Sequence, residues 1–539
     1  MAQAHHSSVW RNASLLVAAL CLTPLLVLLG ALARPDGAIW AHLSAHVLPD
    51  LLSNTAWLLA GVSLFTLTLG VGLAWLVAVC DFPGRRFFSW ALALPLALPA
   101  YVAAFAAVGM LDFTGPLQTW LRDELGWQGG LPPIRSRAGV ALVLAFSFYP
   151  YIYLLARQAF ASQGRRALEV GQSLGLGPWR GFWHIALPAA RPWIAGGLLL
   201  VWMETLADFG AVSVFNYDTF TTAIYKSWFA MFSMQAAAQL ASLLVLLVLL
   251  LAASESWARR RRAYHASGKS GALRYPLHGA RAWLAQAACV LVLLLAFVAP
   301  ILQLLFWAWQ NREGVDERFW SFVGNSLLAA AGAALAAASA ALVLARAARL
   351  HQAFGMQLLI KAATLGYAIP GAVLAVGIFI PIAWLDGRLI EAAQALGWQV
   401  SAQGFLRGSI LVLLLAFVVR FLAVAFHPVD GAMQRITRNQ EDAARSLGLS
   451  GLALLRRLHW GMLKGGLFTA LLMVFVDVMK EMPITLMLRP FGWETLSVRV
   501  FQMTSEGMWE SAAAPALALV AAGLLPVILL GRQEEFSAE

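Results

Sequence analysis

Four acidic residues lie inside long apolar stretches of this 539-residue chain, where ionised side chains are costly and tend to mark functional sites. Glu204 and Asp208 are four positions apart, and Asp477 and Glu481 repeat that spacing 273 positions later (477 minus 204). On a helix, this spacing places both carboxylates of a pair on one face. Four converging carboxylates would suit a hard cation, which prefers oxygen ligands. We expect the set to act in a pathway or a gate, and we assign no metal site firmly.

A structural role for these carboxylates is the alternative. Lys480 is close enough in sequence to pair with Asp477 or Glu481. Asp208 and Glu481 would also be less costly if they lay near the outer interface of a membrane. The spacing alone does not separate these interpretations.

A second repeated pattern lies in polar loops between apolar stretches. Residues 169–176 read EVGQSLGL and residues 442–449 read DAARSLGL, again 273 positions apart (442 minus 169). Each has an acid, small residues and a Leu-Gly pair, and the glycine permits the tight turn that ends a short helix. We predict two equivalent short helices, with these residues forming a functional surface: Glu169, Val170, Gly171, Leu174 and Gly175 in the first, and Asp442, Ala443, Ala444, Leu447 and Gly448 in the second.

Other reactive residue types form no recognisable catalytic set. Cys21, Cys80 and Cys289 are too far apart in sequence for a CxxC-type ligand set, and the ten histidines form no metal-binding motif. Residues 263–270 read AYHASGKS, which satisfies a loose phosphate-loop pattern. A phosphate loop needs a preceding buried strand and a following helix in an α/β domain, and the surrounding sequence leaves no room for one. We therefore expect no enzyme activity, no ATPase site and no cofactor in this chain.

The composition indicates the fold class. Hydrophobic residues make up 60% of the chain and charged residues 12%, about half the charged fraction of a soluble protein. The apolar residues occur in about twelve runs of the length that spans a bilayer. We predict an all-α polytopic membrane protein with about twelve transmembrane helices.

The positive charges indicate the orientation. The formal net charge is +11, but the lysines and arginines concentrate in alternate loops, including the run Arg259–Arg262, rather than in a nucleic-acid-binding patch. The positive-inside rule then places the amino terminus and both repeated loops in the cytoplasm. The expected partner of these charges is membrane lipid, and no nucleic acid is expected.

The duplication extends along most of the chain. Asn54 corresponds to Asn325, and Pro99 to Pro370, at an offset of 271 (325 minus 54, 370 minus 99). We predict two tandem six-helix halves with the same orientation around a central pathway. Their boundaries are 1–253, with a coupling loop at 165–188, and 282–539, with a coupling loop at 438–461; a basic cytoplasmic linker occupies 254–281.

The two loops resemble the characteristic cytoplasmic loop of permease subunits in binding-protein-dependent ABC importers. The match continues in the first half through LGLGPWRGFWHIALP at 174–188. The second half departs from the pattern, because Asp442 replaces the usual glutamate and Gly461 stands where Pro188 does. In that family the loop docks on the ATPase subunit. The resemblance thus implies two copies of a cytoplasmic ABC ATPase, which bind the ATP, as partners.

Two further stretches, 203–229 and 477–501, resemble those of ferric-iron permeases in the same family. The resemblance implies a bacterial inner-membrane protein that receives Fe(III) from a periplasmic iron-binding protein, at loops around 215–232 and 489–510. The alternatives are an importer permease for thiamine, sulfate, phosphonate or polyamine, and an ion-coupled secondary transporter. A membrane-embedded enzyme would require a catalytic cluster that we do not find.

Overall fold

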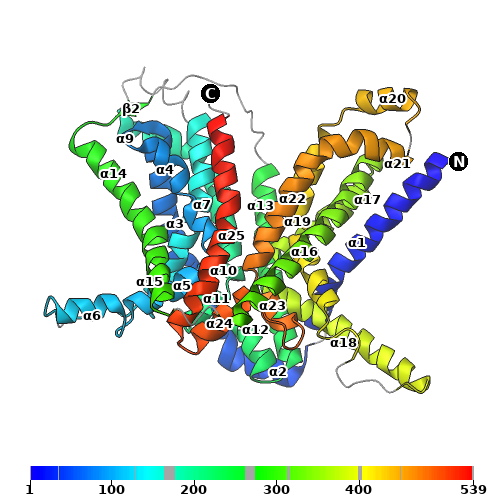
Figure 1. Cartoon of the computed structure of the whole chain (residues 1–539), viewed down its shortest axis with the longest axis horizontal. Coiled ribbons are helices and arrows are strands. Elements are labelled where there is room, and N and C mark those ends of the chain that lie inside the picture. Colours follow the sequence, from blue (N-terminus) through cyan, green and yellow to red (C-terminus); the bar gives the residue numbers. More distant parts are fainter. Residues whose placement is uncertain are drawn as a thin grey trace. The chain divides into compact units, whose positions relative to one another are not determined.

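The computed structural model describes residues 2–33, 35–127, 129–162, 177–260, 274–311, 316–398, 404–449 and 451–536. Within these ranges the chain is almost entirely helical (Figure 1). Twelve helical stretches of the described chain are long and apolar enough to cross a membrane. The predicted fold class is therefore confirmed.

The chain forms two compact units whose segments alternate along the sequence. Unit 1 comprises Met1–Trp40, Ala223–Val245 and Val315–Arg499. The helices wholly within it are α1 (Ala2–Ala33), α16 (Glu317–Leu350), α17 (Phe354–Ala363), α18 (Gly371–Ala395), α19 (Ile410–Gln434), α20 (Arg438–Ser446), α21 (Gly451–Leu454), α22 (Trp460–Lys480) and α23 (Pro483–Leu488).

Unit 2 comprises Ala41–Thr222, Leu246–Gly314 and Val500–Glu539. Its helices are α3 (Leu48–Val79), α4 (Arg85–Ala91), α5 (Ala100–Leu111), α6 (Pro116–Asp123), α7 (Arg137–Ser162), α9 (Pro178–Gly181), α10 (Leu187–Ala207), α11 (Gly210–Val214), α14 (Ala280–Leu293), α15 (Ala299–Gln310) and α25 (Trp509–Phe536). Two short strands, β1 (Cys80–Asp81) and β2 (Tyr275–Pro276), pair in parallel.

Some helices cross a boundary between the units: α2 (Gly37–His42), α12 (Phe220–Phe229), α13 (Met234–Arg260) and α24 (Leu496–Ser505). Short turns of other helical types connect or extend the helices: η1 (Leu43–Val47), η2 (Leu94–Ala97), η3 (Phe182–Ala186), η4 (Leu294–Val298), η6 (Thr364–Ala368) and η7 (Leu455–His459).

Corresponding helices repeat at the offset seen in the sequence. Helices α10 and α22 are each 21 residues long and begin 273 positions apart (460 minus 187). Each follows a π-helical turn, η3 and η7 respectively. The repeat therefore extends to the local backbone conformation.

The repeat extends to side-chain contacts as well. Asn54 Nδ2 donates a hydrogen bond to the Asp218 carbonyl at 3.1 Å in unit 2. Asn325 Nδ2 donates to the Glu494 carbonyl at 2.9 Å in unit 1. These two asparagines are the pair that the sequence placed opposite each other, so their equivalence is structural.

Small residues bring the long helices of each unit close together. In unit 2, a Cβ atom at Gly70 of α3 would lie 2.8 Å from the Ile152 Cβ atom of α7, so only glycine fits there. In unit 1, α16 packs on α19 and α22. Its buried stripe consists almost entirely of alanines: Ala329, Ala330, Ala333, Ala334, Ala337, Ala338 and Ala341. Such surfaces allow close approach in a membrane, where helix association depends on packing.

The first helix of each predicted half packs on the other half. Helix α1 contacts α16, α17 and α18 of the second half in unit 1, whereas in unit 2 α15 contacts α5 of the first half as well as α25 of its own half. Each compact unit therefore combines segments from both predicted halves, 1–253 and 282–539. The halves stay a prediction about the sequence repeat, which these packing units do not test.

The contact between α1 and α18 can be tested at Gly377. A Cβ atom there would lie 2.9 Å from the Pro24 carbonyl oxygen and 3.1 Å from Leu28 Cδ1. We expect Gly377→Leu to destabilise the protein by about 1–3 kcal/mol, because a close-packed contact cannot absorb the added volume. The measurement is thermal unfolding in detergent, followed with a thiol-reactive dye. The dye reports unfolding because Cys21, Cys80 and Cys289 are all buried in the folded protein and become accessible when it unfolds.

The matched control is Gly387→Leu on the same helix, where an added Cβ atom meets no atom within 4 Å. We expect this variant to unfold close to the temperature of the parent protein. Equal losses in both variants would contradict the proposed contact.

Candidate functional site

The second repeated loop forms a short, well-defined helix. Helix α20 begins with a capping box, in which Gln440 N donates to Thr437 Oγ1 at 3.3 Å and Thr437 N donates to Gln440 Oε1 at 3.0 Å. It ends at Gly448, whose φ of +84° suits glycine, and Leu449 N donates to the Ala444 carbonyl at 3.0 Å. The short helix and its terminal glycine turn are therefore as predicted from the sequence.

This helix has an exposed face and a buried face. Asp442, Ala443, Leu447 and Gly448 are exposed, and the Leu447 side chain is 82% accessible. Ala444, which was predicted to share the functional surface, is buried at 7% exposure. The helical period separates it from Asp442 and Ala443 by about 100–200°. The exposed surface available to a partner therefore consists of four of the five predicted residues.

The buried face carries an acid that the sequence reasoning missed. Glu441 is 7% exposed, and its Oε1 atom lies 2.8 Å from Arg349 Nε and 2.9 Å from His459 Nε2. Arg346 NH1 lies 3.7 Å from the same oxygen. We call these four residues the charge cluster. The sequence contained a signal for this cluster: Arg346 and Arg349 lie three positions apart at the end of an apolar run.

Arg349 connects three elements through its guanidinium. Besides Glu441 of α20, it donates from NH1 to the Met433 carbonyl at 3.0 Å and from NH2 to the Ile436 carbonyl at 2.6 Å. Those two carbonyls lie at the end of α19 and just beyond it. The cluster therefore joins α16, the end of α19 and α20.

The charge of Glu441 is stable at neutral pH. Burial disfavours its ionised form, but the hydrogen bond from Arg349 and the neighbouring positive charges outweigh burial and lower the pKa of Glu441. A carboxyl whose folded-state pKa is depressed stabilises the fold above its unfolded pKa, and loses this contribution as the pH falls through the folded value. The contribution of Glu441 to the anchoring of α20 is therefore lost as the pH falls through its folded-state pKa.

The first repeated loop, Glu169–Gly175, lies outside the described residues. Among the described residues that flank it in the sequence, unit 2 has an aromatic cluster. Trp75 of α3 lies 4.8 Å from Phe182 and 5.6 Å from Phe160, measured between ring centroids. Trp75 occupies the position that corresponds to Arg346 (346 minus 271). The regions beside the two loops thus differ in their chemistry.

The carboxylates at the second position of each pair do not continue a helix. Helix α10 ends at Ala207 and α22 ends at Lys480, so Asp208 and Glu481 have extended backbone conformations. The expectation that each pair shares one helical face was wrong for this reason. Asp208 Oδ1 accepts a hydrogen bond from Val212 N at 3.0 Å, and Glu481 Oε1 accepts one from Ile484 N at 3.3 Å.

A hydroxyl from a later helix closes each of these breaks. Thr221 Oγ1 donates to the Asp208 carbonyl at 2.6 Å, and Ser497 Oγ donates to the Glu481 carbonyl at 3.0 Å. The two acids are therefore equivalent caps at equivalent breaks, one in each unit.

The acid in unit 1 also has a buried cationic partner. Arg420 Nε of α19 lies 3.2 Å from Glu481 Oε2, and Arg420 NH1 donates to the Ile369 carbonyl at 3.0 Å. The corresponding position in unit 2 is Tyr149 (420 minus 271), whose hydroxyl donates to the Leu92 carbonyl at 2.8 Å. Lys480 was the alternative partner suggested for Asp477 or Glu481, and the structure gives Glu481 a partner in Arg420.

The four predicted carboxylates are divided between the two units. Glu204 and Asp208 belong to unit 2, whereas Asp477 and Glu481 belong to unit 1. Glu204 and Asp477 are both half-buried. Among the described residues, no group of three or more His, Cys, Asp or Glu side chains could hold a metal ion. A pathway or gating role for the set therefore stays a prediction.

Comparison with known proteins places these features in context. Residues 66–261 match the family model of the binding-protein-dependent transport system inner membrane component. The chain is 27% identical over 488 residues to the Fe(3+)-transport system permease protein FbpB 2 of Haemophilus influenzae. The aligned region covers 89% of this chain and 89% of that protein. The resemblance predicted from the two loops is confirmed by these matches.

Two relatives from Escherichia coli match a shorter part of the chain. The molybdenum transport system permease protein ModB is 31% identical over 152 residues, 28% of this chain and 65% of ModB. The sulfate transport system permease protein CysW is 31% identical over 170 residues, 31% of this chain and 56% of CysW. Their likeness therefore concerns one part of the chain rather than its duplicated layout.

The ion pair between Arg420 and Glu481 generates a prediction about stability. We expect Arg420→Met to cost about 3–5 kcal/mol, because it leaves the Glu481 carboxylate buried without its guanidinium. The double variant Arg420→Met/Glu481→Gln should recover part of this loss, since a neutral amide keeps an acceptor for the backbone. Thermal unfolding of the single and double variants measures the coupling.

The matched control is Tyr149→Phe at the corresponding position of unit 2. It removes one neutral hydrogen bond, and we expect a loss of about 1 kcal/mol. If the double variant loses as much as the sum of the two single variants, the two side chains do not act as a pair.

Proposed function

We propose that this chain is a membrane permease that carries ferric iron inward as part of an ABC importer, since residues 66–261 match the family model of binding-protein-dependent transport system inner membrane components. The observation that carries the cargo assignment is the match to the Fe(3+)-transport permease across 89% of both chains. The sulfate and molybdenum relatives named above match only 28–31% of this chain.

The energy source in this proposal is a separate ATPase. Two cytoplasmic ATPase subunits would dock on the two coupling loops, one on the segment Glu169–Gly175 and one on the exposed face of α20. A protruding helix with one exposed face suits such a docking role, because it offers a rigid surface to a groove. Asp442, Leu447 and Gly448 supply that surface in the second loop. The chain itself would bind no ATP.

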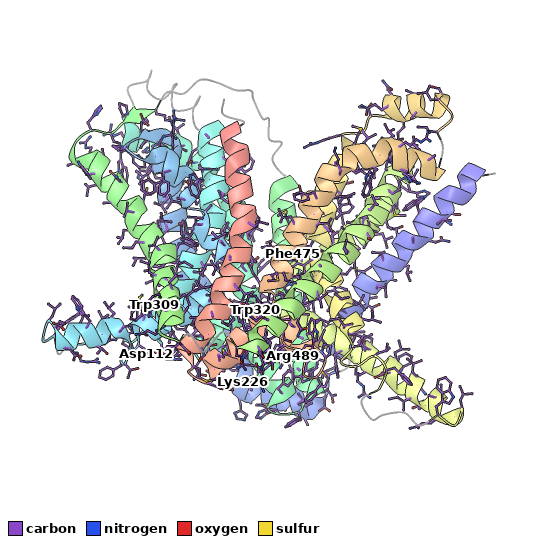
Figure 2. The ribbon with its side chains drawn as sticks, in the orientation of Figure 1. Asp112, Lys226, Trp309, Trp320, Phe475 and Arg489 are labelled. Carbon is purple, nitrogen blue, oxygen red and sulfur yellow. The ribbon has the colours of Figure 1, made fainter. Side chains whose placement is uncertain are left out.

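The periplasmic binding protein would dock at the other end. In unit 1, α20 lies at one end and α23 at the opposite end (Figure 1). Near α23, Phe491 is 99% exposed, and Phe232 beyond α12 is 89% exposed. Lys226 and Arg489 lie at this end of the unit as well (Figure 2). Lys226 is exposed, whereas Arg489 is half-buried and pairs with Glu494 at 3.3 Å. The exposed aromatic side chains and Lys226 suit a partner with an apolar and acidic surface.

The orientation that joins these two assignments has the amino terminus in the cytoplasm of a bacterial cell. ATP-driven closure would then alternate access to a pathway between the two sides of the inner membrane. The proposed pathway or gating residues are Glu204, Asp208, Asp477 and Glu481. Their carboxylate oxygens would attract an Fe(III) cation, whereas they would repel an anionic cargo such as sulfate.

Uptake by proteoliposomes tests this function. The vesicles would contain the chain with its ATPase, and the binding protein loaded with radioactive ferric iron would be outside. We expect ATP-dependent accumulation of iron, which falls to the level without ATP in the double variant Glu169→Arg/Asp442→Arg. The reason is that two positive charges would replace the acids that face the ATPase.

The control variant is Asp123→Arg/Glu124→Arg, which makes the same change in net charge at exposed positions at the end of α6. It should transport as the parent protein does. ATP hydrolysis that responds to a sulfate- or molybdate-loaded binding protein, with no iron accumulation, would overturn the ferric assignment. Uptake that persists without ATP would indicate an ion-coupled transporter instead.

A further inference from the structure

We propose that Glu441 is the positioning residue of the second coupling helix: through the buried charge cluster it holds α20 against α16, the end of α19 and η7, the turn that leads into α22. This inference rests on the proposed coupling function of α20 for its consequence, but its structural part concerns this chain alone. Glu441 directly precedes Asp442, so two adjacent acids would have different roles on different faces of α20. Asp442 faces a partner, and Glu441 faces the protein.

The geometry supports a lock rather than an incidental ion pair. Glu441 contacts residues from two elements besides its own. Arg346 and Arg349 belong to α16, and His459 is the last residue of η7, directly before α22. His459 is fully buried, and the side chains of Arg346 and Glu441 are each 9% exposed. Long side chains that are held by several partners at once have little freedom to move.

The electrostatics make Glu441 the critical member. Within the charge cluster it supplies the only negative charge, opposite two guanidinium groups. Removing one partner of a buried ion pair is strongly unfavourable, because it leaves an uncompensated charge away from water. A neutral residue at position 441 would therefore force the arginines to find water or other acceptors. The contacts that hold α20 would be lost with them.

The sequence of the other half does not repeat these charged residues. The position that corresponds to Glu441 is Leu168 (441 minus 273), Trp75 corresponds to Arg346 (346 minus 271), and Ala186 corresponds to His459 (459 minus 273). Ala78 corresponds to Arg349 (349 minus 271), so all four charged or polar residues have apolar counterparts. The sequence therefore supplies this set of charges in the second half and not at the corresponding positions of the first.

A distance measurement between two spin labels tests the lock directly. Ser339 of α16 and Ser446 of α20 are exposed, and the natural cysteines are buried, so Ser339→Cys and Ser446→Cys can be labelled selectively in the full chain in lipid nanodiscs. We expect a narrow distance distribution in the parent background. Glu441→Gln should broaden it, whereas Asp442→Asn, a loss of the same charge on the exposed face, should leave it narrow.

Further variants show whether the cluster acts as a unit. Arg349→Met should broaden the distribution, and Glu441→Gln/Arg349→Met should be no broader than Arg349→Met alone. Glu441→Asp keeps the charge with a shorter reach and should give an intermediate width; its folded state is checked by size-exclusion chromatography. A narrow distribution in Glu441→Gln, or additive broadening in the double variant, overturns the proposal.

ATP hydrolysis by the complete complex separates this inference from the proposed function. Stimulation of hydrolysis by loaded binding protein should fall to the basal rate in Glu441→Gln. If the distribution broadens but stimulation persists, Glu441 does hold α20, and the proposed role of α20 in coupling is what fails. If stimulation is lost while the distribution stays narrow, coupling through α20 stands and the positioning role of Glu441 fails.

Discussion

The structure depends on one constraint: where a helix breaks in a buried part of the protein, protein atoms must satisfy its free backbone N–H and C=O groups, because an unpaired backbone group away from water is costly. The chain breaks a long helix after Ala207 and again after Lys480. At each break an acidic side chain accepts a hydrogen bond from the next helical turn, and a hydroxyl from a later helix satisfies the carbonyl group of the same acid. The carboxylates that first suggest cation chemistry are therefore also the groups that make the breaks possible.

The duplicated backbone is more symmetric than the side chains that support it. The helices before both breaks have the same length, and the asparagine contacts are the same. Yet Arg420 corresponds to Tyr149, and Arg346 corresponds to Trp75. One half thus uses buried ion pairs where the other uses neutral hydrogen bonds and aromatic packing. Since a buried ion pair is seldom better for stability than an apolar contact of similar volume, the charges in the second half are better explained by positioning than by stability.

Features with a local cause could be predicted from the sequence. The apolar runs indicated the membrane helices, and the Leu-Gly pair with its preceding acid indicated α20 and the glycine turn at Gly448. The helix breaks were missed, because the spacing of four between Glu204 and Asp208 is equally consistent with an uninterrupted helix. The sequence signals for the breaks were Gly210 and Pro483, which are the first residues of the next helices, α11 and α23. The packing of α1 on α18 could not be predicted, because it depends on a small residue, Gly377, facing a distant segment.

Helix α22 connects the two charged sites of unit 1. Its first residue follows His459 of the charge cluster, and its last residue precedes Glu481, which pairs with Arg420. Its 21 residues correspond to a rigid element of about 30 Å, at 1.5 Å per residue. The ion pairs next to both ends of α22 restrain its position within unit 1. In the proposed importer, a displacement of α20 would therefore reach the helix break at Glu481 through α22.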